Sequence, residues 1–190
     1  MNRMSKSIGM AVAALISLAA SAEDFQYLTN TTRITWPEKQ HLGVICNYRN
    51  SQTQVTALAK AIGDGYLITV VDARMADEAG AAAAELAKLK ADYVVLMPQD
   101  QVFRDGTMAT TIAIDRLASR GIPVIGTTPA ALKQGAVFSV GDGTGGQILV
   151  SDHLIGTIDV NLPDRAMISQ KSSLVLRREG MATIRLHSGK

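Results

Sequence analysis

Cysteine is almost absent from this chain, and its scarcity excludes a fold held together by disulfide bonds. The one cysteine, Cys46, has no partner in the chain. It lies within the apolar run "LGVIC", so we expect a buried thiol that packs as a small hydrophobic side chain. The alternative is a reactive thiol, or one that forms a disulfide with another protein.

Long apolar runs are also missing. The longest, residues 8–20, follows Arg3 and Lys6 and is too short for a comfortable membrane span. It ends in "ASA", the small-x-small pattern of a cleavage site, followed by two acidic residues. We expect residues 1–22 to be a signal peptide and the protein to be periplasmic; an uncleaved N-terminal anchor is the alternative.

No surplus of basic charge remains after cleavage. The 19 basic residues become 17, because Arg3 and Lys6 are lost, and 17 acidic residues balance them. A nucleic-acid partner requires a basic surplus, so none is expected. Removing residues 1–22 from 190 leaves 168, which predicts one domain over residues 23–190.

The middle of the chain alternates between apolar runs and helical patterns. Ser51 and Gln54 form a capping-box pattern that predicts a helix start, and its apolar positions repeat every three to four residues up to Gly63. Two further helical patterns follow, the last one ending at Gly121. We expect strands at 41–46, 66–73, 91–97 and 122–127. Because these runs are apolar on both faces, they predict an α/β fold: a doubly wound, mainly parallel sheet with flanking helices.

The sequence "GDGTGG" at 141–146 has the G-x-G-x-x-G spacing of dinucleotide-binding loops. Such a loop must lead from a strand into a helix, so that the helix N-terminus meets the pyrophosphate. Here "AVFSV" precedes it, and the β-rich "QILV" and "GTIDVNL" follow. We therefore predict a turn in a β-rich C-terminal hairpin, and no nucleotide or other cofactor.

Polar residues follow the predicted strands. The carboxyl ends of parallel strands meet at one edge of a sheet, where α/β proteins bind ligands. The N-terminus of the first predicted helix would also be able to receive an anion there. Ordinary capping and turn residues are the alternative explanation. The predicted small-ligand site consists of Asn47, Ser51, Gln52, Gln99, Asp100, Thr127 and Thr128.

Groups typical of catalysis or metal binding are sparse. His41, His153 and His187 do not share metal-ligand spacing, and no G-x-S-x-G motif is present. We therefore expect no metal and no catalytic residues, and a non-enzymatic protein; a hydrolase is a minor alternative.

The segment 91–141 contains a polar stretch from Pro98 to Asp100, a helical pattern, then "IPVIGTT" and "KQGA". This order resembles the bacterial ABC-type substrate-binding proteins that bind amino acids such as tryptophan. The tail "IDVNLPDRAMISQKSSLVL" resembles the closing segment of that family. The resemblance implies a domain that binds a small molecule. Those proteins have two lobes, and 168 residues suffice for one.

Trp36-Pro37 before the first strand and Asn161-Leu162 in the β-rich tail are similar to the YfiR-like periplasmic regulators. That resemblance implies control of an inner-membrane signalling protein. A single lobe would expose a face for such a partner or for a second copy of the chain. The predicted partner surface comprises the tail from Val137 to Leu162 and the N-terminal residues Phe25, Tyr27, Ile34 and Trp36; for Trp36, anchoring in the core is an equal alternative.

These observations favour an exported binding or regulatory domain that acts through a partner. The other hypothesis is a small-molecule-binding lobe related to transporter substrate-binding proteins.

Overall fold

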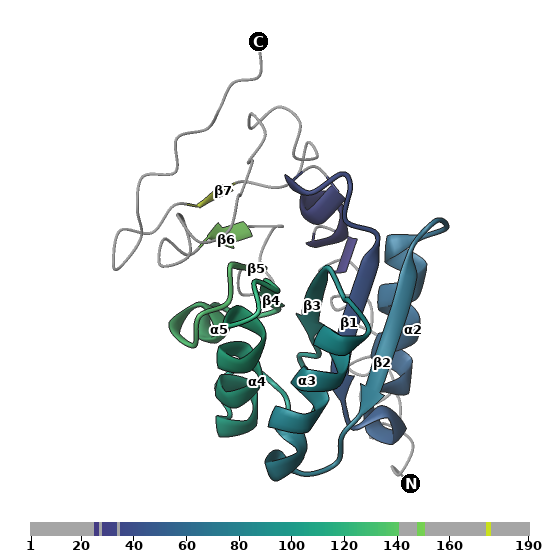
Figure 1. The fold of residues 1–190 in the computed structure, drawn as a ribbon. Helices are drawn as coiled ribbons and strands as arrows, with labels where there is room; N and C mark the ends of the chain where they lie inside the picture. The colour runs from purple at the N-terminus through teal and green to yellow at the C-terminus, as the bar shows by residue number, and fades with distance from the viewer. Residues whose placement is uncertain (1–24, 27, 34, 141–147, 151–173, 176–190) are drawn as a thin grey trace, which may run out of the picture.

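A seven-stranded sheet forms the centre of the protein in a computed structural model (Figure 1). The structure describes residues 25–26, 28–33, 35–140, 148–150 and 174–175. The strands are β1 (His41–Cys46), β2 (Leu67–Asp72), β3 (Tyr93–Leu96), β4 (Val124–Gly126), β5 (Phe138–Val140), β6 (Ile148–Val150) and β7 (Leu174–Val175). The helices are α2 (Tyr48–Ile62), the 3-10 helix η1 (Ala76–Glu78), α3 (Ala79–Lys88), α4 (Met108–Ala118) and α5 (Pro129–Lys133).

The strand order is β2-β1-β3-β4-β5-β6-β7, and the first five strands pair in parallel. The predicted α/β fold with a mainly parallel sheet is therefore confirmed. The chain passes from β1 outward to β2 and then crosses back to β3 on the other side of β1. In such sheets this reversal, between β1 and β3, is the place where ligands bind.

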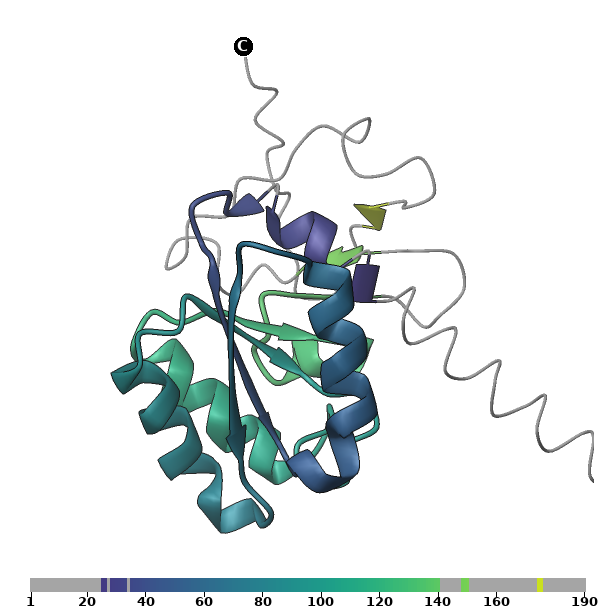
Figure 2. The same cartoon turned by 90° about the vertical axis from the view of Figure 1, so that its right-hand side faces the viewer.

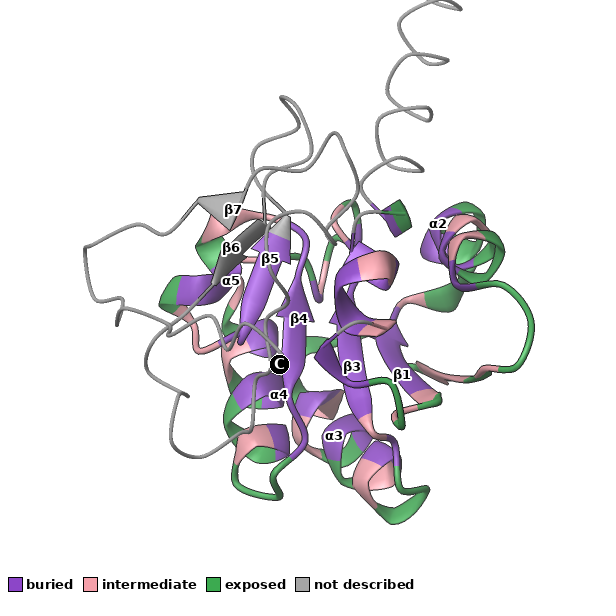
Figure 3. Cartoon of the chain, turned by 90° about the horizontal axis from the view of Figure 1, so that it is seen from above, coloured by how far each residue is buried: buried purple, intermediate pink, exposed green. Residues whose placement is uncertain are grey.

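Helices cover both faces of the sheet (Figure 2). Val55, Leu58 and Ile62 of α2 pack with Val44 and Val95 on one face. Helices α3 and α4 cover the other face through small and apolar side chains. The strands between these layers are buried along their length, apart from the edge strand β2 (Figure 3). Burial on both faces explains why the strand sequences are apolar rather than alternating.

The N-terminal segment packs into the core beside α2. Phe25 and Trp36 are 1% and 3% exposed. The Trp36 ring centroid lies 5.9 Å from that of Tyr93 and 5.5 Å from that of Phe138. Assigning Phe25 and Trp36 to an exposed partner surface is therefore wrong, because both side chains are buried in the core. For Trp36, the alternative of anchoring in the core is correct. Tyr27 and Ile34 lie outside the described residues.

Two element boundaries differ from the sequence prediction. Helix α2 begins at Tyr48 with Asn47 as its N-cap, so Ser51 and Gln54 lie inside the helix and form no capping box. Both side chains are buried and bond to the end of β3. Helix α5 was not predicted, since it has only five residues.

The strands on either side of "GDGTGG" pair with each other. Val140 lies opposite Ile148 in an antiparallel ladder between β5 and β6, which agrees with a hairpin connection. Residues 141–147 themselves lie outside the described residues, as do the predicted signal peptide and residues 151–162. Within the described ranges, no helix has the length and apolar character needed to cross a membrane.

Candidate functional site

The loops at the carboxyl edge of the sheet are joined by Asp100. This carboxylate is fully buried. Its Oδ2 accepts hydrogen bonds from Asn47 N at 2.8 Å and Ser51 Oγ at 2.7 Å. Its Oδ1 accepts from Val102 N at 2.9 Å and Phe103 N at 2.7 Å. Asp100 and Ser51, both predicted to bind a ligand, therefore fix the β1–α2 junction to the loop after β3, and their polar atoms satisfy each other.

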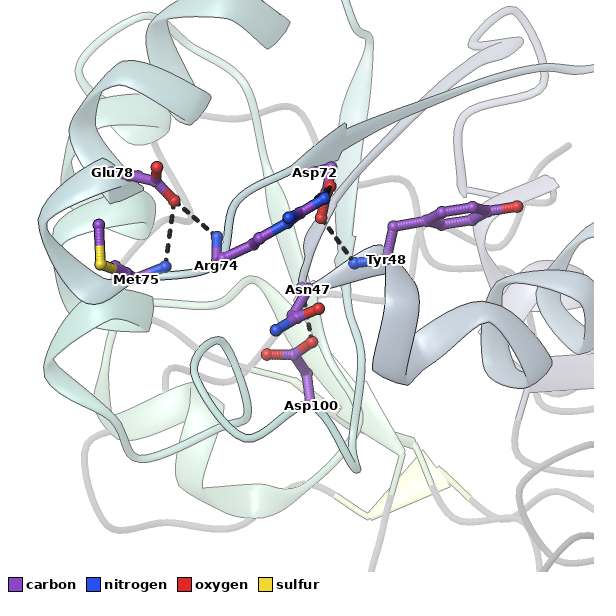
Figure 4. A network of polar contacts seen from close by, with 7 residues as sticks. All are labelled: Asn47, Tyr48, Asp72, Arg74, Met75, Glu78 and Asp100. Atoms are coloured by element: carbon purple, nitrogen blue, oxygen red, sulfur yellow. Dashed lines mark hydrogen bonds and ion pairs between the residues drawn. The ribbon is translucent and has the colours of Figure 1, made fainter.

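Carboxylates already occupy the N-terminus of α2 (Figure 4). Asp100 accepts from the N-cap nitrogen of Asn47, and Asp72 Oδ1 accepts from Tyr48 N at 3.0 Å. These two negative side chains complement the positive end of the helix dipole. The expectation that this helix end receives an anion is therefore wrong, because two protein carboxylates take that place.

The Asp72 carboxylate also forms an ion pair. Arg74 Nη2 lies 2.8 Å from Asp72 Oδ2, and both side chains are substantially exposed. The hydrogen bond from Arg74, aided by that from Tyr48 N, lowers the pKa of Asp72. Glu78 Oε2 accepts from Arg74 N and Met75 N, which fixes the backbone after β2 (Figure 4).

A second aspartate, Asp105, holds the loop after β4. Its Oδ2 accepts from Thr127 N at 3.1 Å, Thr128 N at 2.6 Å and Thr128 Oγ1 at 2.7 Å. Burial raises the pKa of Asp105, against the opposing effect of these hydrogen bonds. Sequence reasoning missed Asp105; it precedes Gly106, a pair typical of turns, and nothing in that pattern indicates a partner 22 residues away.

Two of the predicted ligand residues, Gln52 and Gln99, line a pocket of about 700 Å³ beside α2. Gln99 exchanges hydrogen bonds with Gln54: Gln54 Nε2 donates to Gln99 Oε1 at 3.1 Å, and Gln99 N donates to Gln54 Oε1 at 3.3 Å. The predicted residues are therefore divided. Gln52 and Gln99 belong to this pocket, whereas Asn47, Ser51, Asp100, Thr127 and Thr128 lie outside its lining.

Asn47 retains an unused acceptor at the point between β1 and β3. Its side chain makes no capping hydrogen bond to α2. The Oδ1 atom is buried and has no hydrogen-bond partner among the described residues. Figure 4 shows the Asn47 side chain next to Asp100. A buried carbonyl oxygen without a donor is costly, so this atom is suited to a donor from a ligand.

Cys46 ends β1 beneath this edge and is fully buried. Burial raises the pKa of its thiol to about 12, and the charges of Asp100 and Asp72 add to the rise. The prediction of a buried cysteine is confirmed. The protonated thiol is a poor nucleophile and a poor metal ligand.

Among the described residues, no group of three or more His, Cys, Asp or Glu side chains is placed to hold a metal ion. His41 lies at the opposite edge of the sheet, with Nδ1 3.1 Å from Lys90 O and Nε2 2.8 Å from Thr69 Oγ1. Both ring nitrogens thus have structural partners. His153 and His187 lie outside the described residues.

The fold is similar to that of solved bacterial proteins. A conserved domain protein of Vibrio cholerae aligns with a TM-score of 0.66 and 14% identity over 80% of this chain and 60% of its own. An ABC domain from Streptococcus pneumonia in complex with L-Trp aligns with a TM-score of 0.67 and 12% identity, over the same two shares. A ligand-free, open substrate-binding protein with adhesive properties from Clostridium difficile aligns with a TM-score of 0.57 and 19% identity, covering 77% of this chain and 58% of that one.

These similarities show a fold of the kind found in substrate-binding proteins. This chain spans about 60% of the length of the Vibrio and Streptococcus structures. No protein-family model matches the chain, and a search of curated proteins finds no significant match. The similar structures agree with the resemblance of 91–141 to substrate-binding proteins, and they lend no support to the YfiR-like one.

Proposed function

We propose that this protein is a non-enzymatic binding domain whose ligand is a small polar molecule with an amino group. The ligand lies at the carboxyl edge of the sheet, between β1 and β3. The observation that carries the proposal is the buried Oδ1 of Asn47 at the strand-order reversal, which has no hydrogen-bond partner in the described part of the chain. A ligand N–H or ammonium group would supply the missing donor.

The charge at this edge favours an amino group over an anion. Three carboxylates lie there, those of Asp72, Asp100 and Asp105. Within the described residues, only Asp72 forms an ion pair, with Arg74. These carboxylates attract a cationic group and oppose a phosphate. An amino acid meets these requirements, and the similar Streptococcus structure holds L-Trp.

The loop after β4 supplies the second side of the site. Thr128 is half-buried and donates its hydroxyl proton to Asp105, so its oxygen is left as an acceptor for the ligand. Asp100 and Asp105 act on binding indirectly, by holding the three loops in a fixed arrangement before the ligand arrives. Such preorganisation lowers the entropic cost of binding.

The two nucleophile types near the site are unsuited to catalysis, which supports a binding role. The Ser51 hydroxyl is buried and donates to a carboxylate rather than to a histidine base. The Cys46 thiol is protonated at neutral pH. A protein that binds and releases its ligand unchanged needs neither group.

Isothermal calorimetry with a panel of the free amino acids and small amines tests the proposal. We expect at least one compound to bind, and Asn47→Ala to weaken that binding about tenfold or more. Gln40→Ala is the matched control, because this exposed amide precedes β1 at the opposite edge. Absence of binding by the whole panel, or equal affinity in the Asn47 and Gln40 variants, would overturn the site. Catalytic turnover of an ester, phosphate or peptide that is abolished by Ser51→Ala would overturn the non-enzymatic role.

Export through a cleaved signal peptide at 1–22 is part of the proposal and rests on the sequence pattern alone. N-terminal sequencing of the protein recovered from a periplasmic fraction tests it. Regulation of a membrane signalling protein through a protein partner or a second copy remains the other hypothesis. A neighbouring gene for a membrane-bound cyclase would favour regulation, and a neighbouring permease with an ATPase would favour ligand delivery.

A further inference from the structure

A pocket with several amide side chains in its lining runs along α2, separate from the Asn47 site. Its volume is about 700 Å³. Most of its lining comes from α2, with one residue from the N-terminal segment and one from the loop after β3. The lining residues are Gln26, Asn50, Gln52, Thr53, Gln54, Thr56, Ala57, Lys60, Ala61 and Gln99.

The pocket is long relative to a single amino acid. Along α2 its lining runs from Asn50 in the first turn to Ala61 in the last. Gln26 belongs to the N-terminal segment, whose Thr29 bonds to Ala61 O near the end of α2. From Asn50 to Lys60 the helix rises about 15 Å, at about 1.5 Å per residue. An extended peptide covers that distance with about five residues.

The lining chemistry matches a peptide main chain. Five of the lining side chains are amides, a group that has both a donor and an acceptor, as a peptide unit does. The side chains of Gln26, Asn50 and Gln52 make no hydrogen bond within the described part of the chain, so they are free to bond to a ligand. No aromatic ring is among the described lining residues, which disfavours a base that would need a stacking surface.

The described pocket lining has more hydrogen-bond donors than acceptors available, and its one charged side chain is Lys60. The Oε1 atom of Gln99 is taken by Gln54, which leaves the Gln99 Nε2 group as a donor. Lys60 is exposed and has no ion-pair partner among the described residues, and the described lining contains no carboxylate. Arg33 and Thr29 donate to the final carbonyl groups at Ile62 and Ala61, which offsets part of the negative end of the helix dipole beside Lys60.

We propose that this pocket binds an extended peptide of about five residues whose carboxylate pairs with Lys60. The amide side chains bond to the peptide main chain, and the Lys60 ammonium fixes the peptide's direction. The proposal is independent of the Asn47 site, since the two share no residue. A carboxylate from the peptide's C-terminus and one from an acidic side chain have the same chemistry at Lys60, and the experiment separates them.

The test uses three pools of N-acetylated pentapeptides of mixed sequence: one with free C-termini, one with amidated C-termini, and one amidated pool with a glutamate at the last position. Binding to the purified chain is followed by amide NMR shifts of α2 and by calorimetry. We expect the free-acid pool to bind, Lys60→Gln to weaken binding about threefold, because the pair is exposed, and amidation to produce a similar loss. Rescue by the glutamate pool would assign the contact to a side-chain carboxylate. Lys88→Gln is the matched control, because Lys88 lies in the last turn of α3 on the other face of the sheet.

Equal losses of peptide affinity in Lys60→Gln and Lys88→Gln would overturn the proposal. Amide NMR shifts that do not include α2 residues would also overturn it, as would a sugar acid that binds more tightly than the peptides. Asn47→Ala separates the two sites. If it abolishes amino-acid binding and leaves peptide binding intact, the pocket stands apart from the edge site; if it abolishes both, the independent pocket is wrong.

Discussion

Ser51 and Asp100, 49 positions apart, are joined by a hydrogen bond of 2.7 Å from Ser51 Oγ to Asp100 Oδ2. The two residues follow β1 and β3, the neighbouring strands between which the chain reverses its direction across the sheet. Their bond makes the α2 N-terminus and the loop after β3 one unit. The predictions below concern this unit, its neighbouring aspartates and the core beneath them.

We expect Asp100→Asn to lower the free energy of unfolding by about 2–3 kcal/mol, because an amide NH₂ would face N–H or O–H donors in a buried site. Ser51→Ala removes one donor and should cost about 1 kcal/mol. Urea unfolding followed by Trp36 fluorescence gives both values. Equal stability of Asp100→Asn and the wild type would contradict the structural role of this carboxylate.

Asp105→Asn should gain stability relative to the wild type as pH rises from below the unfolded-state pKa of an aspartate through the raised folded-state pKa. Burial raises the folded-state pKa of Asp105, so folding favours the protonated form. Its stabilising contribution is complete below the unfolded-state pKa and is lost as pH rises through the raised value. Urea unfolding at several pH values checks the slope, with the exposed Asp115→Asn as control; a difference that does not vary with pH counts against the prediction.

Asp72→Asn should show the opposite slope. Arg74 and Tyr48 N lower the pKa of Asp72 in the folded state, so its contribution is present above the unfolded-state pKa and is lost as pH falls. The free energy of unfolding of the wild type should therefore increase relative to that of Asp72→Asn as pH rises. The increase should be small, because the pair is exposed. A weaker slope in an Arg74→Gln background would confirm the contribution of the ion pair, and the bond from Tyr48 N would account for what remains.

Cys46 should resist a disulfide exchange reagent such as DTNB in the native protein at pH 8. With a pKa of about 12, about one thiol in ten thousand is ionised at that pH, and the side chain is buried. Full reaction is expected in concentrated guanidinium chloride. Rapid labelling without denaturant would show that the β1 end opens, and would restore the reactive-thiol alternative.

Trp36→Ala should destabilise the protein by about 3–5 kcal/mol, because the ring is buried against Tyr93 and Phe138. Tyr48→Ala, at a 39% exposed residue, should cost much less. Circular dichroism during thermal unfolding measures both. A Trp36→Ala variant of unchanged stability would contradict the role of Trp36 in the core and favour the predicted partner surface.

Gly126→Ala should be destabilising by about 1–3 kcal/mol, because a Cβ there would lie 2.1 Å from Ala131 Cβ. Gly80→Ala is the matched control: Gly80 lies in α3 with open space around it, so alanine should stabilise the helix by about 0.5–1 kcal/mol. Urea midpoints that move in the same direction for both variants would refute this prediction.

The sequence predicted the alternation of strands and helices because burial on both faces leaves continuous apolar runs, and these are visible without a structure. It also placed the polar residues at the correct edge, since that follows from parallel strands. The short helix α5 escaped prediction, because five residues are too few to show a helical period.

The roles of the edge residues were beyond the sequence. Asp100 is of a residue type that often binds ligands, but two of its four donors come from the start of α2 and two from its own loop. Only the folded structure shows that these donors bond to both carboxylate oxygens of Asp100. Ser51 was misplaced for a related reason: the helix begins three residues earlier at Tyr48, where Asp72 accepts from its backbone nitrogen, and a pattern local to 51–54 cannot report a partner on another strand.

The packing of Trp36 has a consequence for the order in which the chain folds. Trp36 is synthesised long before its partners Tyr93 and Phe138, which follow 57 and 102 positions later. Contacts of such long range form slowly, because a large loop must close before they contribute. The earliest part of the domain to leave the ribosome is therefore among the last to dock, and the core on the α2 side closes only after β5 has been made.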